Sequence, residues 1–189
     1  IEDRELFTLQ ELCNIFSLER VNKAGAIFDL AKLEWMNGQY LRSLPVEDIA
    51  VRCKPLFVEK GYDLSDENKY HLAISVARER CTLLNEIVDY CKMFYQPDEL
   101  RDEDIKTLST LEAQKVLAWF FQNLSSLSLW DMDSIQQLIN KGIAELELKG
   151  KAYYTPIRLA LIHQQHGPEL NATIAILGKE EAIKRIKQF

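Results

Sequence analysis

Glycine and proline are scarce in this chain of 189 residues, with seven of the first and five of the second. Sandwiches, barrels and doubly wound sheets need many turn residues, so this scarcity and the long helix-forming runs argue against all three. No run of about 18 apolar residues occurs, so we expect no membrane-spanning helix. The chain opens with IEDRELFTLQ, which has no Met, basic stretch or signal-peptide core. We therefore expect a fragment of a longer chain without an export signal.

Cysteine spacing excludes the common zinc sites. The four cysteines stand 40, 28 and 10 residues apart, whereas zinc ligands occur in closely spaced pairs. Each lies in an apolar, helix-like stretch, so we interpret all four as buried thiols of a reducing compartment. They are Cys13, Cys53, Cys81 and Cys91.

Catalytic motifs are also absent. The chain has no GxGxxG, P-loop, GxSxG or HExxH pattern, and no pair of carboxylates is marked for acid–base chemistry. His163 and His166 could share a helix face, but Gly167 and Pro168 follow directly and no carboxylate or cysteine joins them at ligand spacing. We therefore predict no catalytic residue and no metal site in this chain.

Charge is distributed unevenly along the sequence. Residues 141–189 carry eight basic and five acidic side chains, a net charge of +3, so the first 140 residues hold −9 of the total of −6. The C-terminal quarter therefore has the sign and density for a modest contact with phosphate. A solvated surface of mixed charge explains the same pattern equally well.

Helix signals in the first half predict an all-α fold. The TLQE sequence at 8–11 is a capping box, Asp29 is a predicted N-cap, and Pro45 is a predicted first-turn proline. Pro55 is expected to kink or end its helix, and Ser65 to cap the following one. Apolar residues recur at helical spacing throughout these segments.

The second half continues the helical pattern. The polar segment 96–104 contains a proline and is the predicted boundary between two helical halves. Lys149 and Gly150 are expected to close one helix, while Thr155 and Pro156 are expected to open the next. The residues by themselves therefore predict a soluble, non-catalytic all-α binding module.

Two stretches of the sequence indicate a more specific function, because they resemble the C-terminal region of bacterial glutamyl-tRNA synthetases. Residues 16–50 contain FSLERV and FDLAKLEWMNGQYLR, which resemble the junction between the helical stem-contact region and the anticodon-binding domain. Residues 155–186 contain TPIRLAL, HGPEL and ILGK, which are similar to the family patterns PLRxAL[TS]G, GPxL and LLGK. Since the order and spacing of both stretches agree, the resemblance covers essentially the whole chain.

The resemblance implies a domain organisation and an activity for the parent protein. Residues 1–44 would end the stem-contact region, while 45–96 and 97–189 would form two helical subdomains that together make an anticodon-binding cage. The parent would be a class I aminoacyl-tRNA synthetase that attaches glutamate to its tRNA with ATP. The HIGH and KMSKS motifs of its catalytic domain do not occur here, so this chain alone should be inactive.

The resemblance also implies cofactors, partners and a location. The fragment would hold no cofactor, whereas the parent's catalytic domain would use ATP and Mg²⁺. Its partner would be the glutamate tRNA, not DNA or a membrane, and the protein would be a cytoplasmic monomer. The alternative is an all-α protein-interaction module that has no role with RNA.

The implied anticodon site uses one arginine from each subdomain. Unpaired anticodon bases can be read along their edges, and the planar fork of arginine suits paired hydrogen bonds. Arg80, in VARERC, would read the third base, which separates glutamate tRNA from glutamine tRNA. Arg158, in TPIRLAL, would contact the middle and neighbouring bases. The remaining implied contacts are Thr155, Gly167, Pro168 and Leu170 in the pocket and Lys32 on the tRNA backbone.

Some of these residue assignments have an alternative, purely structural explanation. Arg78 and Arg80 are two residues apart, about 200° around a helix, so only one can enter a given pocket. The register of the match favours Arg80, and the alternative is that both form exposed ion pairs with Glu79 or Glu86. Another departure is His163, which stands where the family usually has glycine or serine.

Overall fold

The computed structural model describes residues 4–21, 25 and 27–189. These residues form α-helices and one 3-10 helix, without any strand among them, as the all-α prediction requires. None of the helices built by these residues is long and apolar enough to cross a bilayer. Residues 22–24 and 26 of the first resembling stretch lie outside the described residues.

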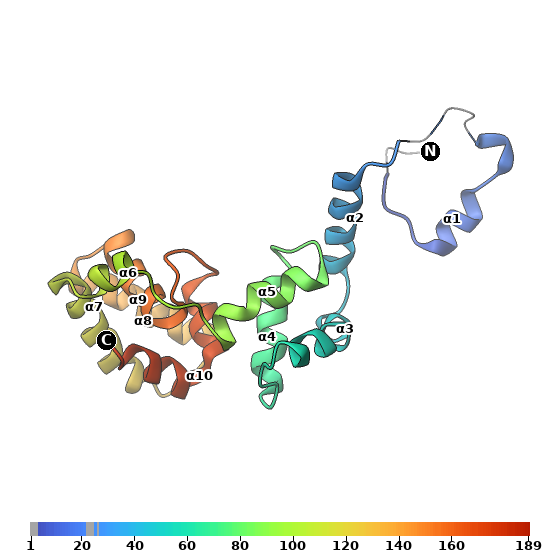
Figure 1. The fold of residues 1–189 in the computed structure, drawn as a ribbon. Helices are drawn as coiled ribbons and strands as arrows, with labels where there is room; N and C mark the ends of the chain where they lie inside the picture. The colour runs from blue at the N-terminus through green and yellow to red at the C-terminus, as the bar shows by residue number, and fades with distance from the viewer. Residues whose placement is uncertain (1–3, 22–24, 26) are drawn as a thin grey trace.

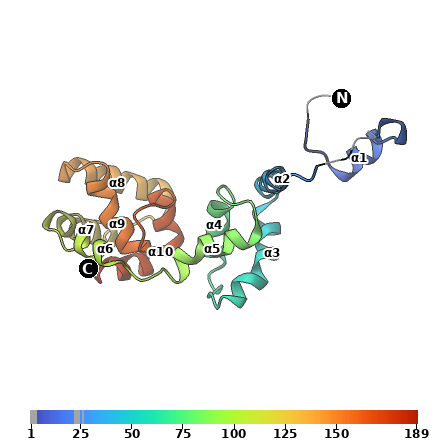
Figure 2. The ribbon, with the colours of Figure 1, turned by 45° about the horizontal axis from the view of Figure 1, so that its top comes forward.

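The N-terminal part lies at one end of the molecule, and its last helix, which contains the buried Leu41, meets the middle helices (Figures 1 and 2). Many of its large apolar side chains are exposed, including Phe16, Leu30 and Trp35. Trp35 lies at helical spacing from Leu30, which is typical of a core position, but its side chain is 43% exposed. The elements of this part are α1 (Leu9–Ile15), a 3-10 helix (Leu18–Arg20) and α2 (Leu30–Ser43).

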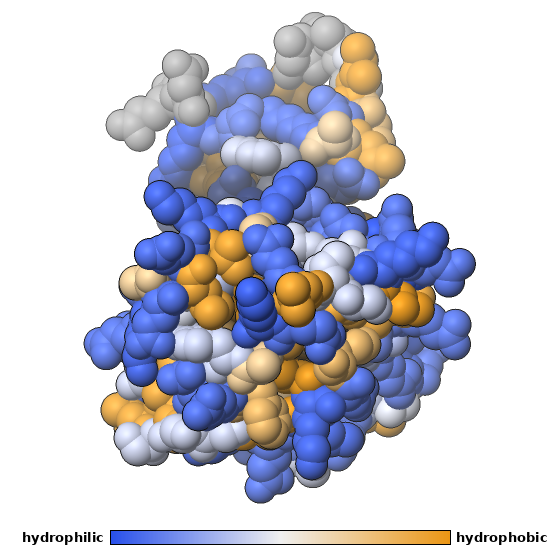
Figure 3. Space-filling model, turned by 90° about the vertical axis from the view of Figure 1, so that its left-hand side faces the viewer, coloured by the Kyte–Doolittle hydropathy of each residue, from blue (hydrophilic) through white to orange (hydrophobic). Residues whose placement is uncertain are grey.

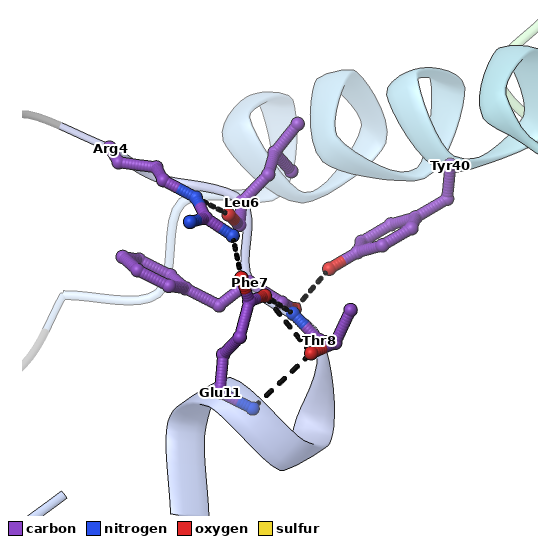
Figure 4. A network of polar contacts seen from close by, with 6 residues as sticks. All are labelled: Arg4, Leu6, Phe7, Thr8, Glu11 and Tyr40. Carbon is purple, nitrogen blue, oxygen red and sulfur yellow. Dashed lines mark hydrogen bonds and ion pairs between the residues drawn. The ribbon is translucent and has the colours of Figure 1, made fainter. Parts of the chain in front are cut away.

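The predicted capping box begins α1. The Thr8 hydroxyl accepts from the Glu11 N–H at 3.2 Å, and the Glu11 carboxylate accepts from the Thr8 N–H at 2.7 Å (Figure 4). Arg4 donates to the same carboxylate at 2.5 Å, and these hydrogen bonds lower the pKa of Glu11 to about 2. Tyr40 donates its hydroxyl to the Phe7 carbonyl at 2.8 Å, so the network connects α1 to α2.

Three helices pack on one another in the middle of the molecule. Phe57 and Ile74 are completely buried between them, as are Cys53 and Cys91. Cys81 is also buried, which confirms three of the four cysteine predictions, whereas Cys13 is exposed and that prediction was wrong. The helices are α3 (Val46–Glu59), α4 (Glu67–Ala77) and α5 (Leu84–Tyr95).

Five helices form the other end of the molecule. Figure 3 shows this end from outside, covered mainly by hydrophilic residues with small hydrophobic patches. Gly178 has a φ of 74° and interrupts the last helix, so its two halves run in different directions. The helices are α6 (Asp102–Leu108), α7 (Leu111–Ser125), α8 (Met132–Leu146), α9 (Lys151–Ile162) and α10 (Leu170–Ile186).

One hydrophobic core runs through both groups of helices. It extends from Leu41 to Ile186, and α10 packs on α4 and α5 as well as on α7, α8 and α9. Arg185, only 6% exposed, reinforces this junction. It donates to Phe94 O at the end of α5 and to Leu161 O at the end of α9, at 3.0 and 2.6 Å. The ends of α5 and α9 are therefore joined through one side chain.

Several predicted helix ends are displaced. Asp66, and not Ser65, caps α4 by accepting from the Lys69 N–H at 2.9 Å. Helix α3 continues through Pro55 to Glu59, because the core contacts of Phe57 outweigh the lost hydrogen bond.

The largest displacement occurs between α8 and α9. Glu147 ends α8 with a φ of 55°, so Gly150 does not close that helix. Gly150 instead precedes α9 with a φ of 56°, which places Thr155 and Pro156 inside the helix and not at its start. The buried Tyr153 explains the earlier start, because its ring fills the core and its hydroxyl donates to Ile139 O at 3.1 Å.

Candidate nucleic-acid interface

The turn that follows α4 separates the two candidate arginines. Arg78 is half-buried and donates from Nη1 to Leu44 O at 2.7 Å, so it fastens the end of α2 to α4. Arg80 is exposed, and its side chain makes no hydrogen bond or ion pair with the described part of the chain. The two side chains thus differ in role, and Arg80 is the one that is available to a ligand.

Arg158 lies on α9 and holds the loop that leads to α10. Its side chain is half-buried, and Nη1 donates to Pro168 O at 2.7 Å. Burial lowers the pKa of Arg158, the nearby carboxylate of Glu169 opposes that shift, and the positive charge of Arg80 adds to it. The charge of Arg80 thus reaches Arg158, although the two residues come from different groups of helices.

Neighbouring side chains leave little room for a side chain at Gly167. A Cβ at this position would come 2.8 Å from Ile162 Cδ1 and 3.8 Å from Arg158 Nη1. A Cβ here would displace the end of the flexible Ile162 side chain and would come into ordinary contact with the Arg158 guanidinium, so glycine gives the closest packing of the loop on both side chains. Gly167 is half-buried while Pro168 is buried, so the backbone, more than the proline ring, faces the surface.

The other predicted site residues differ in their positions. Thr155 is half-buried and lies one turn before Arg158 on α9. Leu170 is 3% exposed and belongs to the core beneath the loop. Lys32 lies apart from them on α2, on the side of α3–α5 away from α9 (Figure 1). Its ammonium is exposed and pairs with Glu5 at 2.5 Å.

Residues that the sequence did not indicate hold the loop between α9 and α10. Gln165 donates to Asp104 Oδ1 at 2.7 Å, and Arg101 donates to Oδ2 of the same carboxylate at 2.8 Å. Asp104 is only 1% exposed, and the hydrogen bonds from Arg101 and Gln165 lower its pKa. The loop is thereby joined to the segment that begins α6.

His163 ends α9 in a conformation that is unusual for a side chain of its size. Its φ is 56°, in the left-handed region that favours glycine. Of the two residues usual at this position in the resembling pattern, glycine would adopt this φ without strain. Nδ1 of His163 lies 2.6 Å from Asp98 O, and its ring packs edge-on against Phe189. These contacts compensate for the backbone strain.

A pair of substitutions measures that strain. We expect His163→Ala to lower the free energy of unfolding by about 1 kcal/mol more than His163→Gly does, because both lose the Asp98 contact but only alanine keeps a Cβ at positive φ. Urea unfolding followed by circular dichroism gives both values. Equal losses for the two variants would show that the conformation carries no strain.

Comparison with known proteins places this arrangement in a family. The family model described as an anticodon binding domain matches residues 48–189, which include both arginines and the loop between α9 and α10. The chain belongs to the anticodon-binding domain family. The fold prediction and the resemblance on which it drew are thereby confirmed.

Relatives in this family carry the name glutamate–tRNA ligase. The chain is 35% identical over its whole length to the glutamate–tRNA ligase of Halalkalibacterium halodurans, and 35% identical over 97% of its length to that of Carboxydothermus hydrogenoformans. It spans 40% of the length of each of these relatives. The matched region is the anticodon-binding, C-terminal part of these ligases.

Solved structures agree with the sequence comparison. A glutamate tRNA ligase from Elizabethkingia meningosepticum, in complex with its amino acid, matches 98% of this chain with a TM-score of 0.81 and 28% identity. The glutamate–tRNA synthetase from Elizabethkingia anophelis gives the same TM-score and identity. The chain covers 37% and 36% of those two structures, respectively.

Proposed function

We propose that this chain reads the anticodon for a glutamate–tRNA ligase. One observation supports the proposal most directly: the family model described as an anticodon binding domain matches residues 48–189, which contain the exposed Arg80 and the loop-holding Arg158. Arg158 holds the loop that leads to α10, and the positive charge of Arg80 reaches it, on a chain whose net charge is −6. Such a site suits an RNA loop, because its bases can be splayed out and its phosphates are negative.

Each residue of the site has a distinct proposed role. Arg80, whose side chain is exposed, reads the third anticodon base, while Arg158 contacts the middle and neighbouring bases. Thr155 and the Gly167–Pro168 backbone line the pocket beside Arg158, and the buried Leu170 supports it from the core. Lys32 contacts the tRNA backbone near the stem, where it would exchange its ion pair with Glu5 for a phosphate.

The proposal extends to the parent enzyme. Its catalytic part would activate glutamate with ATP and Mg²⁺, for which the described residues contain no cluster of metal ligands. The partner is the glutamate tRNA, with no role for DNA or a membrane. The enzyme would act as a monomer in the cytoplasm, where translation takes place.

A binding titration tests the proposal. The 189-residue chain is titrated with transcribed glutamate tRNA and glutamine tRNA at 50 and 200 mM salt. We expect tighter binding to the glutamate tRNA and a steep loss at the higher salt, with log K falling by about 0.7–0.9 per decade of salt for each phosphate neutralised. Binding that is equal for the two tRNAs and insensitive to salt would favour the protein-interaction alternative.

A further inference from the structure

His166 carries an exposed aromatic ring that the fold does not use. It lies in the loop between the end of α9 and the start of α10, and its side chain is open to solvent. Its imidazole makes no hydrogen bond, ion pair or ring contact with the part of the chain that the structure describes. A ring of this kind is available to a ligand without the loss of any contact within the protein.

The loop is anchored on both sides of His166. Before it, the Gln165 side chain donates to Asp104 Oδ1 at 2.7 Å. After it, Pro168 O accepts from Arg158 Nη1 at 2.7 Å, and the proline ring is buried. The backbone that carries the ring is therefore held in place before any ligand arrives, and ordering on binding is confined to the side chain.

The same loop brings His166 close to the guanidinium of Arg158. A Cβ on the next residue, Gly167, would stand 3.8 Å from Arg158 Nη1, and the Cα atoms of successive residues are about 3.8 Å apart. Within residues 4–21, 25 and 27–189, Nη1 is the one guanidinium nitrogen that donates a hydrogen bond, so Nε and Nη2 keep their N–H groups for a ligand. A base that accepts from those groups lies beside the loop, next to His166.

We propose that His166 stacks on the middle anticodon base, the base that Arg158 contacts. The inference rests on the proposed function, because it requires RNA at this site. Unpaired bases of RNA loops stack on aromatic side chains, histidine included, and every base offers a flat π face for such a contact. Arg158 thus holds the edge of the base, while His166 covers its face.

This stacking contributes to affinity and not to the choice between the two tRNAs. Glutamate and glutamine tRNAs share the middle base, so the loss of the ring weakens both equally, by about 5-fold or more. The loss of Arg80, in contrast, is expected to remove the preference for one of them. A charged imidazole that contacts a phosphate would also weaken both tRNAs, so the replacements must separate the ring from the charge.

The experiment titrates the 189-residue chain and its variants with both transcribed tRNAs. We expect His166→Ala and His166→Leu to weaken both about 5-fold or more, and His166→Phe, which keeps a flat ring without a charge, to bind like the wild-type chain. Because the side chain is exposed, all three should melt within about 2 °C of the wild-type chain. His71→Ala is the matched control, since His71 lies on α4 with its ring 5.8 Å from that of Tyr70, and it should bind like the wild-type chain.

An anticodon stem-loop RNA with an abasic middle position tests which base is stacked. Removal of the base should weaken binding to the wild-type chain by a factor about 5-fold larger than for His166→Ala, because that variant has no stack left to lose. Equal factors for the two proteins would overturn the inference.

Arg158→Ala in the same titration separates the inference from the proposed function. If Arg158→Ala weakens binding while His166→Ala binds like the wild-type chain, the inference is overturned and the proposed function stands. A weak His166→Phe also overturns it, because a ring without charge then fails to replace the histidine. If the wild-type chain binds both tRNAs equally, without dependence on salt, and Arg158→Ala changes nothing, the proposed function fails and the inference fails with it.

Discussion

Replacing Arg185 with methionine is expected to lower the free energy of unfolding by about 3 kcal/mol and the melting temperature by about 6–12 °C. The guanidinium donates to Leu161 O, Phe94 O and Met93 O, the last at 3.2 Å, and it pairs with Glu181 at 2.8 Å. Methionine fills a similar volume but leaves three carbonyls without their donor. Urea unfolding and thermal melting measure the loss.

Lys184→Met is the matched control for Arg185→Met. Lys184 is the preceding residue on α10 and also pairs with Glu181, at 3.4 Å, but its side chain is 71% exposed. An exposed pair of this kind contributes little, so we expect a change within about 0.5 kcal/mol. A loss of similar size in both variants would contradict the role of Arg185 as the connection between α5 and α9.

Arg80→Ala is expected to remove most of the discrimination between glutamate and glutamine tRNAs. A good bidentate contact to a base contributes about 1–3 kcal/mol, which corresponds to about 5- to 150-fold in relative affinity. Arg80→Lys keeps the charge but loses the planar fork, so it should restore the affinity for both tRNAs without restoring the preference. Arg158→Ala should weaken both tRNAs, because they share the middle anticodon base. Competition titrations with the two transcribed tRNAs measure these ratios.

Arg52→Ala controls for the loss of positive charge. Arg52 is an exposed residue on α3 and belongs to no proposed contact. Its removal should lower the affinity for both tRNAs slightly and equally, through the long-range field alone. If Arg80→Ala behaves like Arg52→Ala, Arg80 contributes charge but reads no base.

Local signals in the sequence predicted much of the fold. The capping box at Thr8 and the N-cap at Asp29 form as expected, because each depends on side chains within three residues of the helix start. The start of α9 could not be predicted in this way. Thr155 and Pro156 have the composition of a helix start, but the contact of Tyr153 with Ile139, 14 residues away, extends the helix backward.

The same contrast between local signals and long-range contacts holds for the functional and structural arginines. Motif resemblance singled out Arg80 and Arg158, which no local pattern distinguishes from the other arginines of the chain. Arg185 could not be singled out, because its position depends on partners far along the chain. Arg185 bonds to residues 91 and 92 positions away, and in the sequence it is one of several basic residues in a charged C-terminal helix. Only the packing of α10 against α5 gives it a function.

The anchored loop between α9 and α10 determines which molecule becomes ordered on binding. Hydrogen bonds from Gln165 to Asp104 and from Arg158 to Pro168 O already hold this loop in the free protein. In the proposed anticodon site the protein would therefore lose little conformational entropy, and most of the entropic cost would fall on the RNA, whose bases would have to leave their stack. An anticodon loop that is already open in solution would bind with a smaller entropic penalty, so the affinity depends on the dynamics of the tRNA as well as on its sequence.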